Sequence, residues 1–262
     1  MEIVVRPDRQ AVCDLAARLI AARLRARPAL VLGLATGRTM SDIYARLVAM
    51  HRTGGLDFAS AASFNLDEYI GLAPEDPRSY RAYMQAELFD HVNIDPVRTH
   101  LPSGLAADTT AEGAAYEAAI VAAGGIDLQL LGIGENGHIG FNEPGSSLAS
   151  RTRDKTLSRH TRAQNAEMFG GDPAAVPARA MTMGVGTILA ARELILVATG
   201  AAKAEALARA VEGPLTAMVT ASAIQLHPLC LVIADEAAAG RLTQRDYYDS
   251  VFETEPQWAD YR

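Results

Sequence analysis

The chain of 262 residues is long enough to bury the core of one large α/β domain, and 49% of its residues are hydrophobic. Its net charge of −7 lacks the basic surplus that nucleic-acid binding needs, and no apolar run approaches the ~20 residues of a membrane helix. Cys13 and Cys230 lie far apart in apolar segments, without metal-ligand spacing. We therefore expect a cytoplasmic protein with reduced thiols that binds neither nucleic acid nor membrane.

The first predicted elements are a strand at residues 2–5 and a helix capped by Asp8. A continuous apolar run at 29–34 predicts a central parallel strand, which the small-residue loop 35–39 joins to a second helix. Free N–H groups and the helix dipole make such a helix start a candidate anion site. Its residues are Thr36, Gly37, Arg38 and Thr39. Neither a P-loop nor a dinucleotide fingerprint is present, and an ordinary strand-to-helix turn is the alternative.

The next strand and loop, predicted at 61–72, carry two adjacent carboxylates, Asp67 and Glu68. Successive side chains of an extended chain point to opposite sides. We therefore expect one carboxylate to enter a site and the other to cap a helix or meet another polar group. An acid at a strand end is more often a cap than a base, so this segment alone does not identify a catalytic group. Asp76-Pro77 then predicts the start of the following helix.

Residues 126–147 form the segment around which the rest is organised, an apolar strand that ends in a glycine-rich polar loop. Loops at the carboxyl ends of strands are where α/β sheets bind ligands, and glycine lets the backbone approach a ligand closely. His138 lies in this loop, five residues before Glu143. The pattern predicts a general base whose imidazole is oriented by a carboxylate. A tight turn whose polar side chains only hydrogen-bond each other is the alternative.

A basic cluster follows this loop in an otherwise acidic chain: Arg151, Arg153, Lys155, Arg159 and Arg162. A solvated face is the ordinary interpretation of such a cluster, and a second anion contact is the alternative. Glycines and prolines near 170–177 indicate that the segment at about 154–180 is a mobile lid.

A second strand-to-helix unit begins with the predicted strand 193–198, which ends at Thr199-Gly200. Lys203 lies on the first turn of the next helix, where it suits an anion or is simply a surface lysine. The polar tail at about 245–262 is expected to be loosely held. The alternation of strands and helices predicts a single α/β domain over residues 1–262, with a doubly wound, mostly parallel sheet and helices on both faces.

Several of these segments together resemble the glucosamine-6-phosphate deaminase family of aldose–ketose isomerases, and they occur in the family's order over about residues 30–235. The segment FNEPGSS distinguishes this family from the related 6-phosphogluconolactonases, and it is present here. The resemblance implies a sugar-phosphate isomerase type of fold. The matching segments are LGLATG (32–37), FNLDEYIGL (64–72), GGIDLQLLGIGENGHIGFNEPGSSLASRTR (124–153), MGVGT (183–187, where the family has VGVGT), VATGAAKAEAL (197–207) and SAIQLHP (222–228).

The resemblance implies a role for each candidate residue. Asp67 is expected to move a proton between C2 and C1 of the open-chain sugar, and His138 to open the pyranose ring. Glu143 and Asn136 are expected to orient the histidine. The loop Thr36-Gly37-Arg38-Thr39 and Lys203 are expected to bind the phosphate of an amino-sugar phosphate. Because no redox step or electron sink is needed, no organic cofactor and no metal are expected.

Four positions depart from the usual pattern of this family or vary within it. Arg38 and Met40 stand where a glycine and a proline are usual, and Asn136 stands where many members have aspartate. Glu167 aligns with a phosphate-binding arginine of the lid, and a carboxylate there would repel a phosphate dianion. We hypothesise that Arg38 supplies the missing cation from the opposite side of the pocket. The alternative is a different amino-sugar phosphate as substrate.

Regulation and two other functions are also open at this stage. Ser146, Arg153 and Lys155 match residues of an N-acetylglucosamine 6-phosphate activator site found between subunits of hexameric members, whereas other members are unregulated monomers. A homo-oligomer is therefore a possibility. A non-catalytic sugar-phosphate sensor is disfavoured because the chain keeps Asp67, His138 and the carboxylate five residues later. A lactonase or simple isomerase on the same fold would release no ammonia.

Overall fold

The computed structural model describes residues 1–262, and its core is a parallel sheet of seven strands in the order β1-β10-β9-β6-β2-β3-β5. Each pairing within this sheet is parallel, so all the carboxyl ends meet at one edge. The predicted doubly wound architecture is thereby confirmed. The strands are β1 (Glu2–Arg6), β2 (Val31–Leu34), β3 (Ala62–Asn65), β5 (Thr99–His100), β6 (Leu128–Leu131), β9 (Glu193–Ala198) and β10 (Cys230–Asp235).

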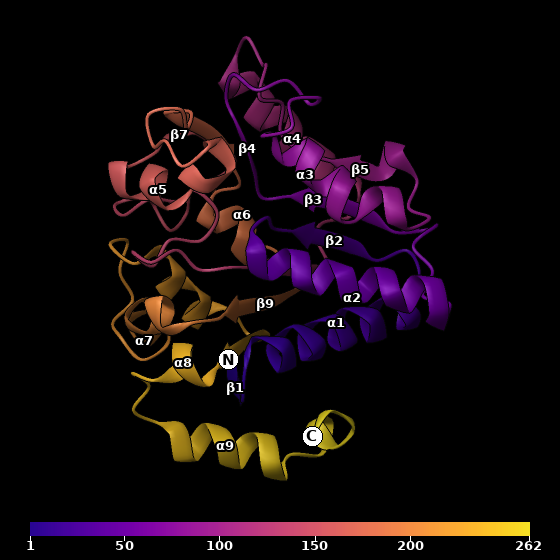
Figure 1. Ribbon diagram of the computed structural model, residues 1–262, viewed down its shortest axis with the longest axis vertical. Helices are drawn as coiled ribbons and strands as arrows, with labels where there is room; N and C mark the ends of the chain where they lie inside the picture. The colour runs from indigo at the N-terminus through magenta and orange to yellow at the C-terminus, as the bar shows by residue number, and fades with distance from the viewer.

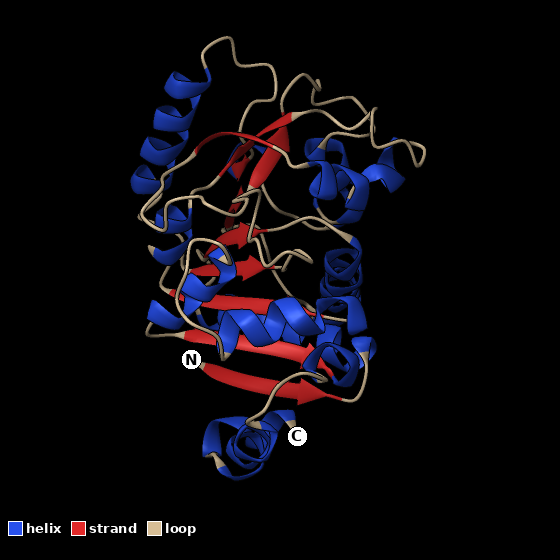
Figure 2. Ribbon diagram, turned by 90° about the vertical axis from the view of Figure 1, so that its left-hand side faces the viewer, coloured by secondary structure: helices blue, strands red, loops and turns tan.

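Helices cover both faces of this sheet, as Figure 2 shows. None of them combines the length and the apolar character needed to cross a membrane. The first helix begins where expected, because the Asp8 carboxylate accepts the N–H of Ala11. The α-helices are α1 (Arg9–Ala26), α2 (Arg38–Gly54), α3 (Tyr80–Glu87), α4 (Thr109–Ala122), α5 (Arg159–Gln164), α6 (Val185–Leu189), α7 (Ala204–Val211), α8 (Glu236–Ala239) and α9 (Arg245–Thr254). Short 3-10 helices are η1 (Phe89–His91), η2 (Pro96–Arg98), η3 (Ala166–Phe169), η4 (Ala201–Lys203), η5 (Thr220–Leu226) and η6 (Pro256–Tyr261).

A second, antiparallel sheet was not predicted from the sequence. It consists of β4 (Asp67–Tyr69), β8 (Arg179–Thr182) and β7 (Arg153–Thr156), in that order. The segment predicted to be a lid therefore starts and ends in a small sheet and carries α5 and η3 between its ends. Its contacts with the body form a separate hydrophobic cluster, in which Phe169 of the lid packs edge-on against Tyr69.

Two expectations about local structure are wrong. Helix α3 starts at Tyr80, because the Ser79 hydroxyl caps it by accepting the N–H of Ala82. Asp76, the expected cap, instead accepts the N–H and guanidinium groups of Arg78 in the preceding turn. The C-terminal tail is also not loosely held.

The tail forms α9 and η6 and packs against the outer strand β1, at the end of the molecule opposite the small sheet (Figure 1). Phe252 and Trp258 are buried there, and their rings contact each other. The indole Nε1 of Trp258 donates to Glu2 Oε2 at 3.0 Å. Two aromatic anchors therefore stabilise a segment whose average composition is polar.

Candidate active site

A cavity of about 810 Å³ lies at the carboxyl ends of the central strands. Its walls come from the loops after β2, β3, β6 and β9, and the segment predicted to be a lid contributes α5 and η3 to its lining. The sequence-predicted residues that line this cavity are Thr36, Gly37, Arg38, Thr39, Asp67, His138 and Lys203. The fold thus gathers segments more than 160 residues apart into one site, as expected for the carboxyl edge of a parallel sheet.

Asp67 and Glu68 separate as the alternation of side chains predicted. Asp67 faces the cavity, although only 6% of it is exposed. Glu68 turns away and accepts the N–H groups of Tyr80 and Arg81, each at 2.9 Å, so it holds the start of α3. Glu68 is thus the carboxylate of the pair that meets a helix start, in addition to the Ser79 cap, and Asp67 is the one that faces the cavity.

The environment of Asp67 favours its protonated form. No protein hydrogen bond supports the carboxylate, and burial raises its pKa to about 8, with a further contribution from the charge of Glu68. A carboxylate in such a site binds a proton far more tightly than a solvated one. It is therefore suited to take a proton from a weakly acidic carbon and to return it.

His138 is held by a chain of two polar side chains. Its Nδ1 lies 2.6 Å from Asn136 Oδ1, and Asn136 Nδ2 donates to Glu143 Oε2 at 3.2 Å. Because an amide oxygen only accepts, Nδ1 carries the proton and Nε2 keeps its lone pair. Asn136 is thus the direct partner of the histidine, and Glu143 orients the asparagine.

Burial keeps the imidazole neutral. It lowers the pKa of His138, although the negative charge of Glu143 opposes the shift. The ring packs tightly on Gly134, where a Cβ atom would lie 2.3 Å from His138 Cε1. The neutral ring is therefore fixed in orientation as well as in tautomer.

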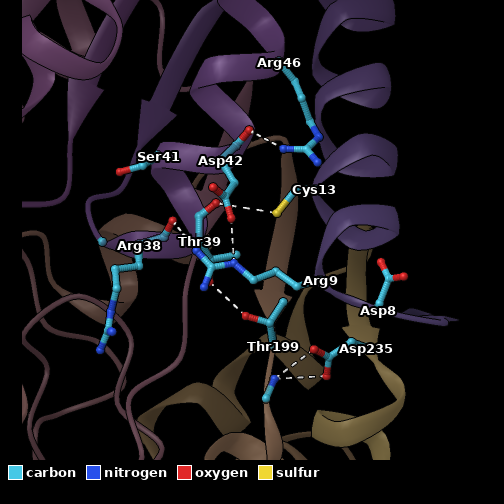
Figure 3. Close-up of polar contacts among 12 residues, drawn as sticks. Asp8, Arg9, Cys13, Arg38, Thr39, Ser41, Asp42, Arg46, Thr199 and Asp235 are labelled. Atoms are coloured by element: carbon cyan, nitrogen blue, oxygen red, sulfur yellow. Dashed lines mark hydrogen bonds and ion pairs between the residues drawn. The ribbon is translucent and has the colours of Figure 1, made fainter.

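A second part of the cavity, at the start of α2, is built to receive an anion. Gly37 adopts φ = 120°, a conformation that favours glycine, and no side chain caps α2 after it. The hydroxyl groups of Thr39 and Thr199 lie 2.9 Å apart and join the two strand-to-helix loops (Figure 3). Lys203 lies beside them, and burial lowers its pKa while the Glu135 carboxylate opposes that shift. Uncapped N–H groups, hydroxyls and a lysine are together the usual ligands of a phosphate.

Arg38 and Glu167 meet across the mouth of this cavity. Arg38 Nη2 lies 3.3 Å from Glu167 Oε2, and the two side chains are 79% and 71% exposed. The carboxylate therefore faces the cavity instead of turning away from it, and the arginine stands opposite, as the sequence hypothesis required. An exposed pair of this kind is worth little energy, so a ligand with two negative charges can displace the carboxylate from the arginine.

The cavity is also lined by residues that no sequence pattern had indicated. Tyr83 donates its hydroxyl proton to the carbonyl oxygen of Gly37 at 2.9 Å. His160 of the lid has Nε2 at 3.8 Å from Glu135 Oε2. Arg9 and Tyr80 also line the cavity. None of these four residues lies in a predicted motif.

A family model described as glucosamine-6-phosphate isomerases/6-phosphogluconolactonase matches residues 8–234. The chain belongs to this family.

Relatives within the family differ widely in similarity. A glucosamine-6-phosphate deaminase of Hahella chejuensis is 51% identical over 248 residues, covering 95% of this chain and 94% of that protein. The solved structure of a monomeric glucosamine-6-phosphate deaminase has a TM-score of 0.90 at 41% identity, covering 92% of this chain and all of that one. A 6-phosphogluconolactonase of Trypanosoma brucei has a TM-score of 0.74 at 20% identity, covering 92% and 98%. The last comparison shows the fold alone.

The residues predicted to bind an activator do not line the cavity. Ser146, Arg153 and Lys155 lie outside it, and so does the rest of the basic cluster. Arg153 lies on β7, and its guanidinium donates to Asn142 Oδ1 at a distance of 2.9 Å. Ser146 is buried, and its hydroxyl group has no hydrogen-bond partner in the protein. Arg151 pairs with Glu117 instead. The basic cluster therefore contributes no ligand to the substrate cavity.

Proposed function

We propose that the protein converts glucosamine 6-phosphate and water into fructose 6-phosphate and ammonia. One observation carries this proposal: a single cavity contains two buried groups, Asp67 and His138, together with a candidate anion site. Burial shifts the pKa of each group in the direction that favours its neutral form. The names of relatives at about half identity support the same reaction. The phosphate of the sugar would occupy the loops at Thr36–Thr39 and Thr199–Lys203, which leaves C1 and C2 at the buried end.

Ring opening is the first step, and His138 is its acid–base group. The lone pair on Nε2 accepts the proton of the anomeric hydroxyl, and the imidazolium gives this proton to the ring oxygen as the C1–O5 bond breaks. The imidazolium that forms carries its Nδ1 proton on Asn136, and the Glu143 carboxylate beyond it stabilises the charge. The product of this step is the open-chain amino aldehyde.

Proton transfer from C2 to C1 follows, and Asp67 performs it. The ionised carboxylate takes the C2 proton while the ammonium group of the substrate gives a proton to the C1 oxygen, which yields an enolamine. Asp67 then returns its proton to C1, which leaves an iminium at C2. Water adds to that carbon, and ammonia leaves to give the ketose. Every atom is supplied by substrate and water, so the protein has to provide proton transfer and positioning only.

The lid and the other amino-sugar phosphates belong to the same proposal. Closure of residues 154–180 would exclude water until the iminium has formed, and the aromatic contact between Phe169 and Tyr69 supports such a docked position. The charge of Glu167 at the mouth is the one feature that favours a different amino-sugar phosphate. Oligomerisation, and activation through Ser146, Arg153 and Lys155, remain predictions.

The deciding experiment measures ammonia and fructose 6-phosphate formed from glucosamine 6-phosphate, with Asp67→Asn as the matched variant. We expect equal amounts of both products from the wild type and loss of both in the variant. With substrate that carries deuterium at C2, the label should appear at C1 of the fructose 6-phosphate. If the folded wild type releases no ammonia, the proposal is wrong for this substrate, and galactosamine 6-phosphate and mannosamine 6-phosphate are tested next.

A further inference from the structure

Arg9 is a cavity residue far in sequence from the loops it contacts. It is the first residue of α1, and its side chain lines the cavity beside the turn that begins α2. Its Nε lies 2.6 Å from Asp42 Oδ2, and its Nη2 donates to the carbonyl oxygen of Arg38 at 2.8 Å. Figure 3 shows the guanidinium between these two groups. One side chain thus contacts the first turn of α2 at two points.

We propose that Arg9 is a positioning residue for the phosphate of the substrate, which it serves by fixing the backbone of Arg38. The inference rests on the function proposed above. The side chain of Arg38 is 79% exposed, and its one ion-pair partner is the lid residue Glu167, so contacts of its own do not hold it in place. Its backbone carbonyl is held by Arg9, which therefore determines from where the Arg38 guanidinium enters the cavity.

The neighbouring atoms of the same turn are held by uncharged groups. The carbonyl of Gly37 accepts from Tyr83, the carbonyl of Thr39 accepts from the Cys13 thiol, and the Thr39 hydroxyl meets Thr199. Arg9 is the one cation in this set, so it also adds positive potential beside the phosphate. A planar guanidinium can serve two acceptors in fixed directions, which a lysine ammonium cannot do in the same way.

A matched ion pair is available as a control. Arg46 of α2 pairs with Asp14 of α1, so it joins the same two helices, but neither residue lines the cavity. Arg46 also contacts the same part of α2, because its Nη1 donates to the carbonyl oxygen of Asp42. Removing Asp14 therefore tests the loss of a helix-to-helix ion pair without the loss of a cavity cation.

The experiment compares steady-state kinetics and inhibition by inorganic phosphate in the wild type, Arg9→Ala, Arg9→Lys and Asp14→Ala. We expect Arg9→Ala to raise both KM and the inhibition constant of phosphate at least about fivefold, with kcat within about twofold. Asp14→Ala should leave all three within about twofold of the wild type. Arg9→Lys should stay impaired, because an ammonium cannot hold both acceptors.

Three results would overturn the proposal. The first is an Arg9→Ala variant that behaves like Asp14→Ala, and the second is a fall in kcat at unchanged KM. The third is complete rescue by Arg9→Lys, which would mean that charge alone matters. Calorimetric titration with inorganic phosphate gives the same comparison without turnover. A wild type that binds phosphate through Arg9 but forms no ammonia would contradict the proposed reaction and leave this inference standing.

Discussion

The two ends of the cavity use charge in opposite ways. At the proposed phosphate end, Arg38 is largely exposed and stands near Lys203, so these cations would attract an anionic ligand together. At the reacting end, burial moves the pKa of Asp67 up and that of His138 down, and both groups tend toward their neutral forms. When several cations attract one anion, binding persists after one cation is removed. Proton transfer, in contrast, depends on a single acid or base, and its loss stops the step. Substitutions at the two ends should therefore differ in cost by orders of magnitude.

The largest effect is expected at the reacting end, in the variant His138→Asn. It should lower kcat by about 10²–10⁴, because ring opening loses its acid–base group while the phosphate end is intact. KM should change little. His160→Asn, which removes the other histidine of the cavity, is the control and should keep most of the activity. A loss below tenfold in His138→Asn would place the acid–base group elsewhere.

The pH dependence should report the raised pKa of Asp67. Only the ionised carboxylate can take the C2 proton, so kcat/KM should rise about tenfold per pH unit below a pKa of about 8 and level above it. The rate profile between pH 6 and 9.5 measures this. A profile that is already level from pH 6 would contradict the assignment.

The variant Glu68→Gln separates this effect from the ionisation of the substrate. It keeps an oxygen acceptor for the N–H groups of α3 but removes a charge that raises the pKa of Asp67. The inflection in the rate profile should therefore move to lower pH. Ionisations of the substrate are the same for both proteins and cannot produce such a shift.

A smaller effect is expected at the phosphate end, in the variant Arg38→Gly. KM should rise at least about tenfold, which corresponds to about 1.4 kcal/mol, with kcat nearly unchanged. Glu167→Gln should have the opposite sign and lower KM, because it removes the carboxylate that competes with phosphate for Arg38. An unchanged KM in Arg38→Gly would show that the arginine does not compensate for the carboxylate of the lid.

The smallest effect concerns stability. A buried acid with a raised pKa destabilises the folded state increasingly as pH rises from the unfolded value near 4 to about 8. Asp67→Asn should therefore melt at a higher temperature than the wild type, by about 2–4 °C for each kcal/mol relieved. The gain should be greater at pH 8 than at pH 5. A variant less stable than the wild type at both pH values would mean that Asp67 is not strained by burial.

The central features of the fold follow from local sequence patterns. Apolar runs predicted β2, β6 and β9, and the alternation of side chains predicted that Asp67 and Glu68 would face opposite ways. The antiparallel sheet was missed because β4 and β8 are more than 100 residues apart and short, so no local pattern announces their pairing. The tail was misjudged because its average polarity concealed Phe252 and Trp258, whose burial depends on an outer strand at the other end of the chain.

The sequence predicted those residues of the candidate site that lie in recognisable motifs. The loops with His138 and with Thr36–Thr39 each follow a predicted apolar strand, and they line one cavity, as expected. Arg9 and His160 lie in no motif, since α1 and α5 become neighbours of the site only through tertiary packing. The sequence also could not predict which side chain contacts His138 directly. Spacing indicates that Asn136 and Glu143 are near, but only the fold shows that the asparagine lies between the other two.

Leu66 is the single residue that joins β3 of the parallel sheet to β4 of the small sheet, so it is a point about which the small sheet could rotate. Its N–H donates to Leu34 of the parallel sheet, and its carbonyl accepts from Met183, which follows the last strand of the lid sheet. If the lid sheet rotates as a rigid body about this junction, displacement grows with distance from the axis. Asp67 is the next residue along the chain and would therefore move little. On the function proposed above, such a rotation would open the cavity to substrate while Asp67 keeps its place beside the other proposed catalytic groups.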